Sequence, residues 1–190
     1  MNQVQKKFAF VIAFLLILSG CNPATLKYQL DPDIESLNIL PDTIKIVAVK
    51  VTDLREDADL TSKQLPVLGP NDEAKVLQEK LTALLKQRGY KIISKPLLAD
   101  LAFNLEIKTL ALTIEELTFK SIIKGKSEIK ITVNKHSEQW SKIFRATSMQ
   151  EVANPINNLD VTGVINKMLT KQFSEAFSDT ALEEFIKKNQ

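Results

Sequence analysis

The chain has 190 residues, of which 25 are basic and 23 acidic, so its formal net charge is +2 at pH 7. The first 20 residues contain Lys6 and Lys7, and without them the other 170 residues have 23 basic and 23 acidic side chains and are formally neutral. Proteins that bind nucleic acid usually have a clustered basic surface and a high pI, so this balance argues against such a partner. The length is sufficient for one domain with a hydrophobic core and a short tether.

The N-terminal residues have the pattern of a signal peptide. Lys6 and Lys7 provide a positively charged start, and an unbroken apolar run follows from Phe8 to Leu18. At about 1.5 Å per residue, this run would span roughly 17 Å as a helix, well short of the ~30 Å hydrocarbon core of a bilayer. It is therefore too short for a permanent transmembrane anchor.

The apolar run ends in a lipobox, Leu18-Ser19-Gly20-Cys21. The small side chains of Ser19 and Gly20 allow a signal peptidase close access to the backbone, and the thiol of Cys21 is the group that accepts lipid. Cys21 is the sole cysteine and cannot form an internal disulfide. An ordinary secretory signal with an accidental cysteine is the alternative. We expect residues 1–20 to be cleaved and Cys21 to be acylated.

Acylation of Cys21 would fix the location of the protein. Similar bacterial lipoproteins carry a diacylglycerol on the cysteine and usually a further fatty acid, such as palmitate, on its amine, and two or more chains make membrane attachment stable. The next residue is Asn22, where enterobacterial lipoproteins retained in the inner membrane usually have Asp. This resemblance predicts the periplasmic face of the outer membrane.

Residues 21–43 are expected to form a lipidated tether ahead of a single periplasmic domain at 44–190. Three prolines oppose helix formation here, and the full length would reach at most about 70 Å. The alternating apolar residues of 25–30 also permit pairing with a sheet edge. The prolines are Pro23, Pro32 and Pro41, and the alternating residues are Leu26, Tyr28 and Leu30.

The domain is expected to begin with a buried strand at 44–51, which is rich in β-branched residues. A long loop at 52–71 follows, and its acidic residues suggest oxygen ligands for calcium. The EF-hand spacing is missing, however, and Arg55 among these acids opposes a cation, so we expect no metal site. The acidic residues are Asp53, Asp57 and Asp59.

A helix is expected from about 72 to 88. Asn71 or Asp72 can cap its start, and a leucine stripe on one face indicates packing on a sheet. Gly89 suits the left-handed position after the last turn. A short strand at 90–94 follows and ends before Pro96. The stripe consists of Leu77, Leu81, Leu84 and Leu85.

Three consecutive strands come next, at 102–114, 119–135 and 139–152. In the first of these strands, the apolar residues change from odd-numbered to even-numbered positions, which predicts a bulge near 108–110. The polar stretch at 134–138 predicts a hairpin, and the lack of an intervening helix predicts an antiparallel meander.

The C-terminal part is expected to be helical. A wide apolar stripe begins near Leu159 or Asp160, and Asp179 can cap a last short helix. The order of elements predicts an α+β fold, a two-layer sandwich with a mixed, mostly antiparallel sheet of four to five strands and two main helices on one face.

Catalytic chemistry is not predicted. His136 is the only histidine and lies in the expected hairpin turn, and Glu115 and Glu116 are neighbours whose side chains would point to opposite faces of a strand. No glycine loop for phosphate is present, so we expect no catalytic residues, no cofactor and no enzyme. Trp140, the only tryptophan, is interpreted as a cap on the end of the sheet, with a partner contact as the alternative.

Four features resemble the YajG-like family of bacterial lipoproteins. They are the lipobox, Asp53 and Arg55 directly after the first strand, the sequence 87–90 at the end of the first long helix, and the ending 179–187. The similarity covers most of the chain from Cys21 onward. It implies a fold and an envelope location. Because the family is uncharacterised, Cys21 is the only functional residue that it implies.

Two functions remain open at this point. The leading hypothesis is a non-enzymatic outer-membrane lipoprotein whose periplasmic domain binds another component of the cell envelope, for which a protein is expected. The alternative is an auxiliary lipoprotein subunit of an envelope lipid-transport complex, suggested by fold-level analogy alone. A lipid-handling domain should have an apolar groove between helices and sheet, whereas a protein-binding domain should have an open patch or strand edge.

Overall fold

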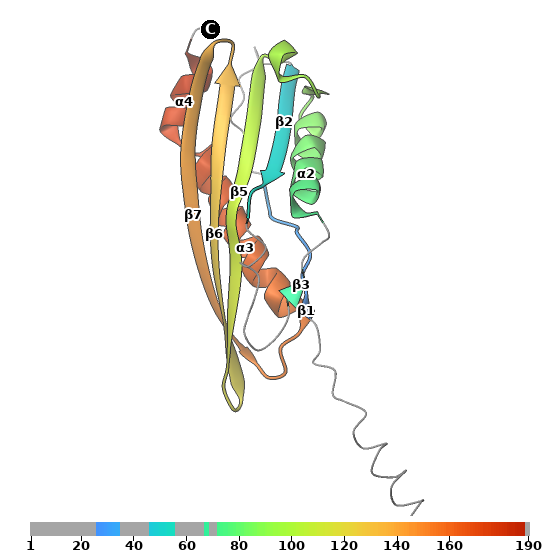
Figure 1. Ribbon diagram of the computed structural model, residues 1–190, viewed down its shortest axis with the longest axis vertical. Coiled ribbons are helices and arrows are strands. Elements are labelled where there is room, and N and C mark those ends of the chain that lie inside the picture. The colour runs from blue at the N-terminus through green and yellow to red at the C-terminus, as the bar shows by residue number, and fades with distance from the viewer. Residues whose placement is uncertain (1–25, 35–45, 56–66, 69–71, 189–190) are drawn as a thin grey trace, which may run out of the picture.

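The structure is a computed structural model that describes residues 26–34, 46–55, 67–68 and 72–188. Its main feature is a five-stranded sheet of order β4-β2-β5-β6-β7 (Figure 1). The two pairings of β2 are parallel, and the longer β5–β6 and β6–β7 pairings are antiparallel. The strands are β2 Ile46–Asp53, β4 Lys91–Ile93, β5 Leu101–Glu116, β6 Lys120–Lys135 and β7 Glu138–Ala153. The predicted α+β fold and the antiparallel meander are confirmed.

Helix α2 spans Glu73–Gln87 and packs on β2 and β4. The Asp72 side chain caps it by accepting a hydrogen bond from the backbone N–H of Lys75 at 2.8 Å. Gly89 follows with φ +89°, as the sequence predicts. In the leucine stripe Leu84 is half-buried and the other three are buried. Pro96–Leu98 then form the 3₁₀ turn η1.

The three long strands extend past the helices. Each of β5, β6 and β7 has 16 residues, which corresponds to about 50 Å. Helix α3, Asn158–Phe177, has 20 residues, which corresponds to only about 30 Å. Because the strands are longer than α3, the lower end of the β5–β6 hairpin projects beyond this helix (Figure 1).

The register between β5 and β6 shifts between Ile107 and Thr109, so the predicted bulge is confirmed.

Helix α3 packs on β6 and β7. Asn157 and Asp160 form a capping box at its start. The helix approaches β6 closely at Gly125, where a Cβ atom would lie 2.6 Å from the side chain of Met168. Helix α4, Thr180–Lys187, is capped by Asp179 and covers the upper end of the sheet in Figure 1. No helix among the described residues is long and apolar enough to cross a membrane.

Residues 26–34, expected to belong to the tether, pack on the domain. Leu26, Tyr28, Leu30 and Ile34 are buried in the same core cluster as the leucines of α2 and the apolar stripe of α3. The alternative pairing with a sheet edge takes a different form, because β1 (Leu26–Lys27) pairs in parallel with β3 (Val67–Leu68) in a separate two-stranded sheet. The physical reason is that alternating apolar residues can also fill the groove between two helices.

Candidate functional site

Several predicted site residues lie outside the part of the chain that the structure describes. They are the lipobox residues Leu18, Ser19, Gly20 and Cys21, the loop acids Asp57 and Asp59, and the tether at 35–43. The site is therefore built from the first described segment, 26–34, and from the surfaces around it.

Segment 26–34 is held on α3 by a regular series of hydrogen bonds, which we call the ladder. Every second backbone N–H of the segment donates to a side chain at every fourth position of the helix. Two residues of extended chain advance about 6.6 Å and four residues of helix about 6.0 Å, so the two spacings nearly match. The bonds are Lys27 to Asn158 Oδ1 at 2.9 Å, Gln29 to Thr162 Oγ1 at 3.2 Å, Asp31 to Asn166 Oδ1 at 2.8 Å and Asp33 to Thr170 Oγ1 at 2.8 Å.

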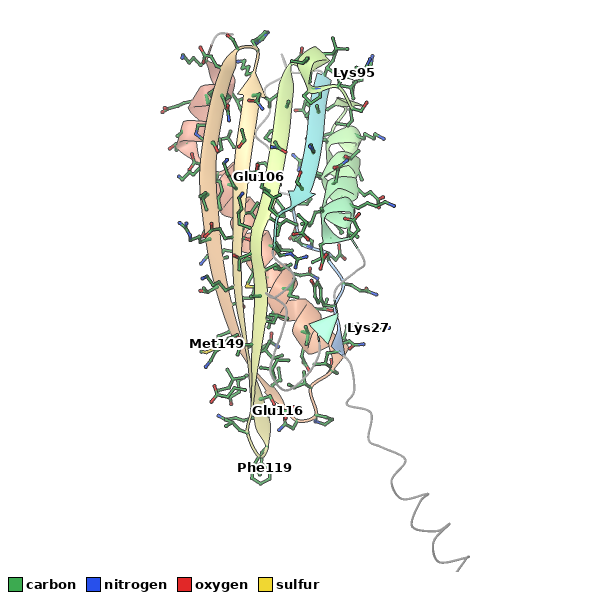
Figure 2. All side chains as sticks on the ribbon, viewed as in Figure 1. Lys27, Lys95, Glu106, Glu116, Phe119 and Met149 are labelled. Carbon is green, nitrogen blue, oxygen red and sulfur yellow. The ribbon has the colours of Figure 1, made fainter. Side chains whose placement is uncertain are left out.

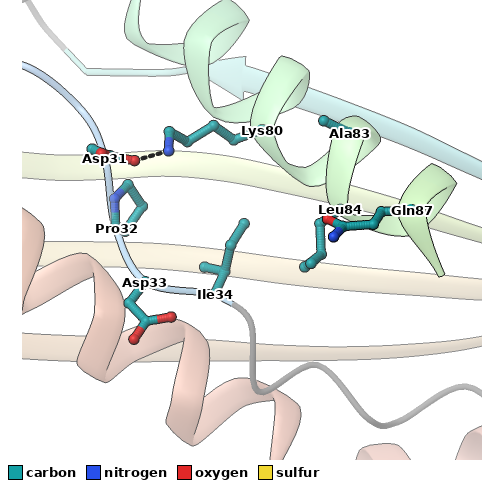
Figure 3. A pocket seen from close by; sticks show the side chains of 8 residues that line it. All are labelled: Asp31, Pro32, Asp33, Ile34, Lys80, Ala83, Leu84 and Gln87. Atoms are coloured by element: carbon teal, nitrogen blue, oxygen red, sulfur yellow. Dashed lines mark hydrogen bonds and ion pairs between the residues drawn. The ribbon is translucent and has the colours of Figure 1, made fainter.

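The ladder also uses an acceptor of the segment. Asn166 Nδ2 donates to the carbonyl oxygen of Gln29 at 3.1 Å, so its amide binds both a donor, the Asp31 N–H, and an acceptor on the same edge of the extended backbone. On the opposite side, the side chains of Tyr28, Leu30 and Ile34 enter the core. The groove between α2 and α3 is therefore filled by residues of the chain itself (Figure 3).

A polar cluster that is buried at Tyr28 and Glu73 and reaches the surface at Asp53 joins this segment to the rest of the fold. The hydroxyl of Tyr28 donates to Glu73 Oε1 at 2.8 Å, and Arg55 Nη2 lies 2.9 Å from Glu73 Oε2 and 2.6 Å from Asp53 Oδ2. The four residues come from the segment, the end of β2 and the start of α2. The presence of Asp53 and Arg55 in the motif that resembles the lipoprotein family is thus explained by their ion pair within the fold.

The cluster changes the protonation equilibria of its members. Burial raises the pKa of Tyr28, and the neighbouring Glu73 carboxylate raises it further. Burial alone would raise the pKa of Asp53 and lower that of Arg55, but their mutual hydrogen bonds prevail, so the pKa of Asp53 falls and that of Arg55 rises. Asp53 and Arg55 are therefore both charged around neutral pH, and the Tyr28 hydroxyl keeps its proton.

A hollow of about 460 Å³ lies beside residues 31–34 and the second half of α2 (Figure 3). Lys80 of α2 forms an ion pair with Asp31 across it. Within the described ranges, no three metal-ligating side chains come together, and Asp53 is engaged by Arg55. The hollow therefore offers an open surface of mixed polar and apolar side chains. Its lining comprises Asp31, Pro32, Asp33, Ile34, Lys80, Ala83, Leu84 and Gln87.

The other candidate residues are dispersed. His136 lies in the β6–β7 turn with φ +53°. Trp140 is half-buried and its ring centroid is 6.3 Å from that of Phe144, which fits its interpretation as a cap. Glu115 pairs with Lys124 at 3.0 Å, and Glu116 is exposed in the hairpin. The structure does not bring these residues together.

The sheet face opposite the helices is polar and uncovered. Cross-strand ion pairs run along it: Glu106 with Lys130 at 3.8 Å, Glu128 with Arg145 at 2.7 Å, and Lys120 with Glu151 at 2.8 Å. Two apolar side chains of β7, Ile143 and Met149, are exposed on this face, Met149 by 69%. Among the described strands, β7 pairs only with β6 and leaves a long free edge.

The sequence carries a signal for the ladder in the spacing of short polar residues along α3. Positions 158, 162, 166 and 170 are all Asn or Thr at a spacing of four, on the helix face beside the apolar stripe. Such short polar side chains can accept hydrogen bonds from a neighbouring backbone.

Comparison with known proteins gives consistent results. A family model described as "Uncharacterized lipoprotein" matches residues 42–187. The uncharacterized lipoprotein YajG of Escherichia coli strain K12 is 24% identical over 97% of this chain and 98% of its own, and that of strain CFT073 has the same values. A crystal structure of protein XCC0632 from Xanthomonas campestris, 11% identical, has a TM-score of 0.51 and covers 87% of this chain and all of that chain. That structure supports the fold alone.

Replacing Asn166 should loosen the docked segment. In Asn166→Ala, the N–H of Asp31 and the carbonyl of Gln29 lose their partner, at a cost of about 1–3 kcal/mol in the free energy of unfolding. Hydrogen exchange should show faster exchange at the amides of residues 27–33. Lys167→Ala, at the adjacent exposed position, is the control and should change neither quantity. Unaltered exchange in Asn166→Ala would show that the ladder does not hold the segment.

Asp53 should make stability depend on pH. Its pKa is lowered in the folded state, so the unfolded chain binds more protons near pH 4 and stability falls as pH decreases through and below that range. Asp53→Asn removes this contribution. Urea unfolding should show the largest stability difference between wild type and variant above about pH 5, shrinking towards pH 3. Glu184→Gln, an exposed carboxylate of α4, should leave the profile unchanged. A constant difference at all pH values would contradict the assignment.

Proposed function

The chain belongs to the uncharacterized lipoprotein family, and on that premise we propose that it is anchored through acylated Cys21 to the periplasmic face of the outer membrane, where its domain binds another envelope protein. The lipobox and Asn22 support the anchor and its location. The free edge of β7 and the uncovered face beside it support the binding role.

The observation that carries the binding role is the 16-residue edge strand β7, which has a neighbour on one side only among the described strands. An edge of this length has unpaired backbone groups along one side, and an extended peptide can pair with them. Ile143 and Met149 lie on the same strand and offer apolar contacts beside the edge. A partner that adds a strand here would use both features.

The proposed role is binding rather than catalysis. Carboxylates on the uncovered face, such as Glu106 and Glu128, are engaged in ion pairs with basic neighbours. A role in lipid transport would favour an empty apolar groove between helices and sheet. In this chain Tyr28, Leu30 and Ile34 fill the groove between α2 and α3, which favours protein binding over a lipid site between these helices.

The anchor is tested by Cys21→Ala. Without a thiol no diacylglycerol can be attached, so the variant should neither label with fatty acid nor fractionate with the outer membrane. The wild-type chain should do both. A variant that still labels and still fractionates with the outer membrane would refute acylation at this residue.

The binding surface is tested with a photo-crosslinking amino acid in the lipidated protein in intact cells. Placed at Ile143 or Met149, it should form one discrete protein adduct that mass spectrometry identifies. Lys75 and Lys171, exposed on α2 and α3, are matched controls and should not form that adduct. Equal adducts from all four positions, or none from β7, would contradict binding at this face. An adduct with a lipid-transport component would favour the auxiliary-subunit role.

A further inference from the structure

The β5–β6 hairpin has exposed apolar side chains at its turn. Phe119 is 86% exposed and Leu117 is 41% exposed, and Leu159 at the start of α3 is 79% exposed. Figure 2 shows Phe119 at the extreme lower tip of the molecule, and Figure 1 shows the start of α3 at the same end. Turns in water usually contain Gly, Pro, Asn, Asp or Ser, so an aromatic residue at this tip requires a reason.

The turn is held in one conformation by Asn154. The N–H of Leu117 donates to the carbonyl of Lys120 at 2.8 Å. Asn154 Nδ2 donates to the carbonyl of Leu117 at 2.6 Å and to the carbonyl of Lys120 at 3.3 Å. The backbone N–H of Asn154 donates to the carbonyl of Phe119 at 3.3 Å. Three carbonyls of the turn, those of Leu117, Phe119 and Lys120, thus accept hydrogen bonds within the protein, which reduces the cost of moving the turn into a less polar medium.

The chain enters the fold close to this turn. The N–H of Lys27 donates to Asn158, and Asn158 is four residues after Asn154, a separation of at most about 14 Å. Cys21 precedes Leu26 by five residues, so it lies within about 18 Å of the start of β1 whatever path the chain takes. Docking of residues 26–34 therefore shortens the expected long tether and keeps the anchor at the hairpin end.

We propose that Leu117, Phe119 and Leu159 insert into the headgroup region and upper acyl chains of the membrane that carries Cys21. This rests on the acylation of Cys21 proposed above. A short anchor brings the bilayer to this end of the domain, and aromatic side chains are favoured at membrane interfaces. The nearby basic residues Lys120 and Lys124 are paired with Glu151 and Glu115, so insertion is driven by apolar burial and is insensitive to salt.

A nitroxide label tests the insertion in the full lipidated protein. Cys21 is the only native cysteine and its sulfur is consumed by acylation, so Phe119→Cys provides a single labelling site. Leu97→Cys is the matched control, because Leu97 is 99% exposed in η1. This turn directly follows Lys95, which Figure 2 shows at the end of the molecule opposite Phe119. Both proteins are reconstituted into vesicles of phosphatidylethanolamine and phosphatidylglycerol. Power-saturation measurements then compare collisions with oxygen, which concentrates in lipid, and with a nickel chelate, which stays in water.

The label at 119 should collide several-fold more often with oxygen and several-fold less often with the chelate than the label at 97, at low and high salt alike. Equal collision rates at 119 and 97, with the protein still floating with the vesicles, would overturn the insertion while leaving the anchor intact. A label at 119 that is shielded from both reagents would indicate a protein contact, such as a second copy, and would also overturn it. Protein that does not float would contradict the acyl anchor itself.

Discussion

The hydrogen-bond ladder between residues 26–34 and α3 determines from which end of the domain the chain leads towards Cys21. An extended segment outside a sheet must find partners for its backbone N–H groups, and the Asn and Thr side chains of α3 provide them at a matching spacing. A slip along the helix would remove the hydroxyl of Tyr28 from Glu73. The ladder therefore has one register, and that register fixes the end of the domain from which the N-terminal residues leave.

The buried cluster around Arg55 reinforces this register. The Glu73 carboxylate and the Arg55 guanidinium are largely out of water, and ion pairing offsets their desolvation cost only in part, so such clusters contribute little net stability. We infer that this cluster contributes specificity. Its members come from three separate parts of the chain, and their contacts form together only when Tyr28, Arg55 and Glu73 are all in place. A misplaced segment would leave the buried Glu73 Oε1 without the Tyr28 hydroxyl, at a cost of about 1–3 kcal/mol.

Local signals were sufficient for most of the fold and insufficient for the segment. The cap at Asp72, the bulge after Ile107 and the hairpin at His136 depend on neighbouring residues, and all were predicted. The ladder joins residues more than 130 positions apart, and alternation cannot distinguish a sheet edge from a groove between helices. Pro32 favoured a tether, yet its missing N–H is harmless, because only the odd-numbered residues donate to α3. The hairpin and the β7 edge could not be recognised as surfaces before the layers were known.

Because residues 26–34 are docked on the domain, the lipid anchor would also restrict the orientation in which the domain meets a partner. A free tether of about twenty residues would let the domain tumble above the membrane, whereas a short connection beside an apolar tip restricts its orientation. The long strands would then stand away from the bilayer, with the edge of β7 reaching about 50 Å from the hairpin end. A partner in the same membrane would meet this edge at a defined height and angle. Less rotational freedom is then lost on binding, so a modest interface suffices for specific association.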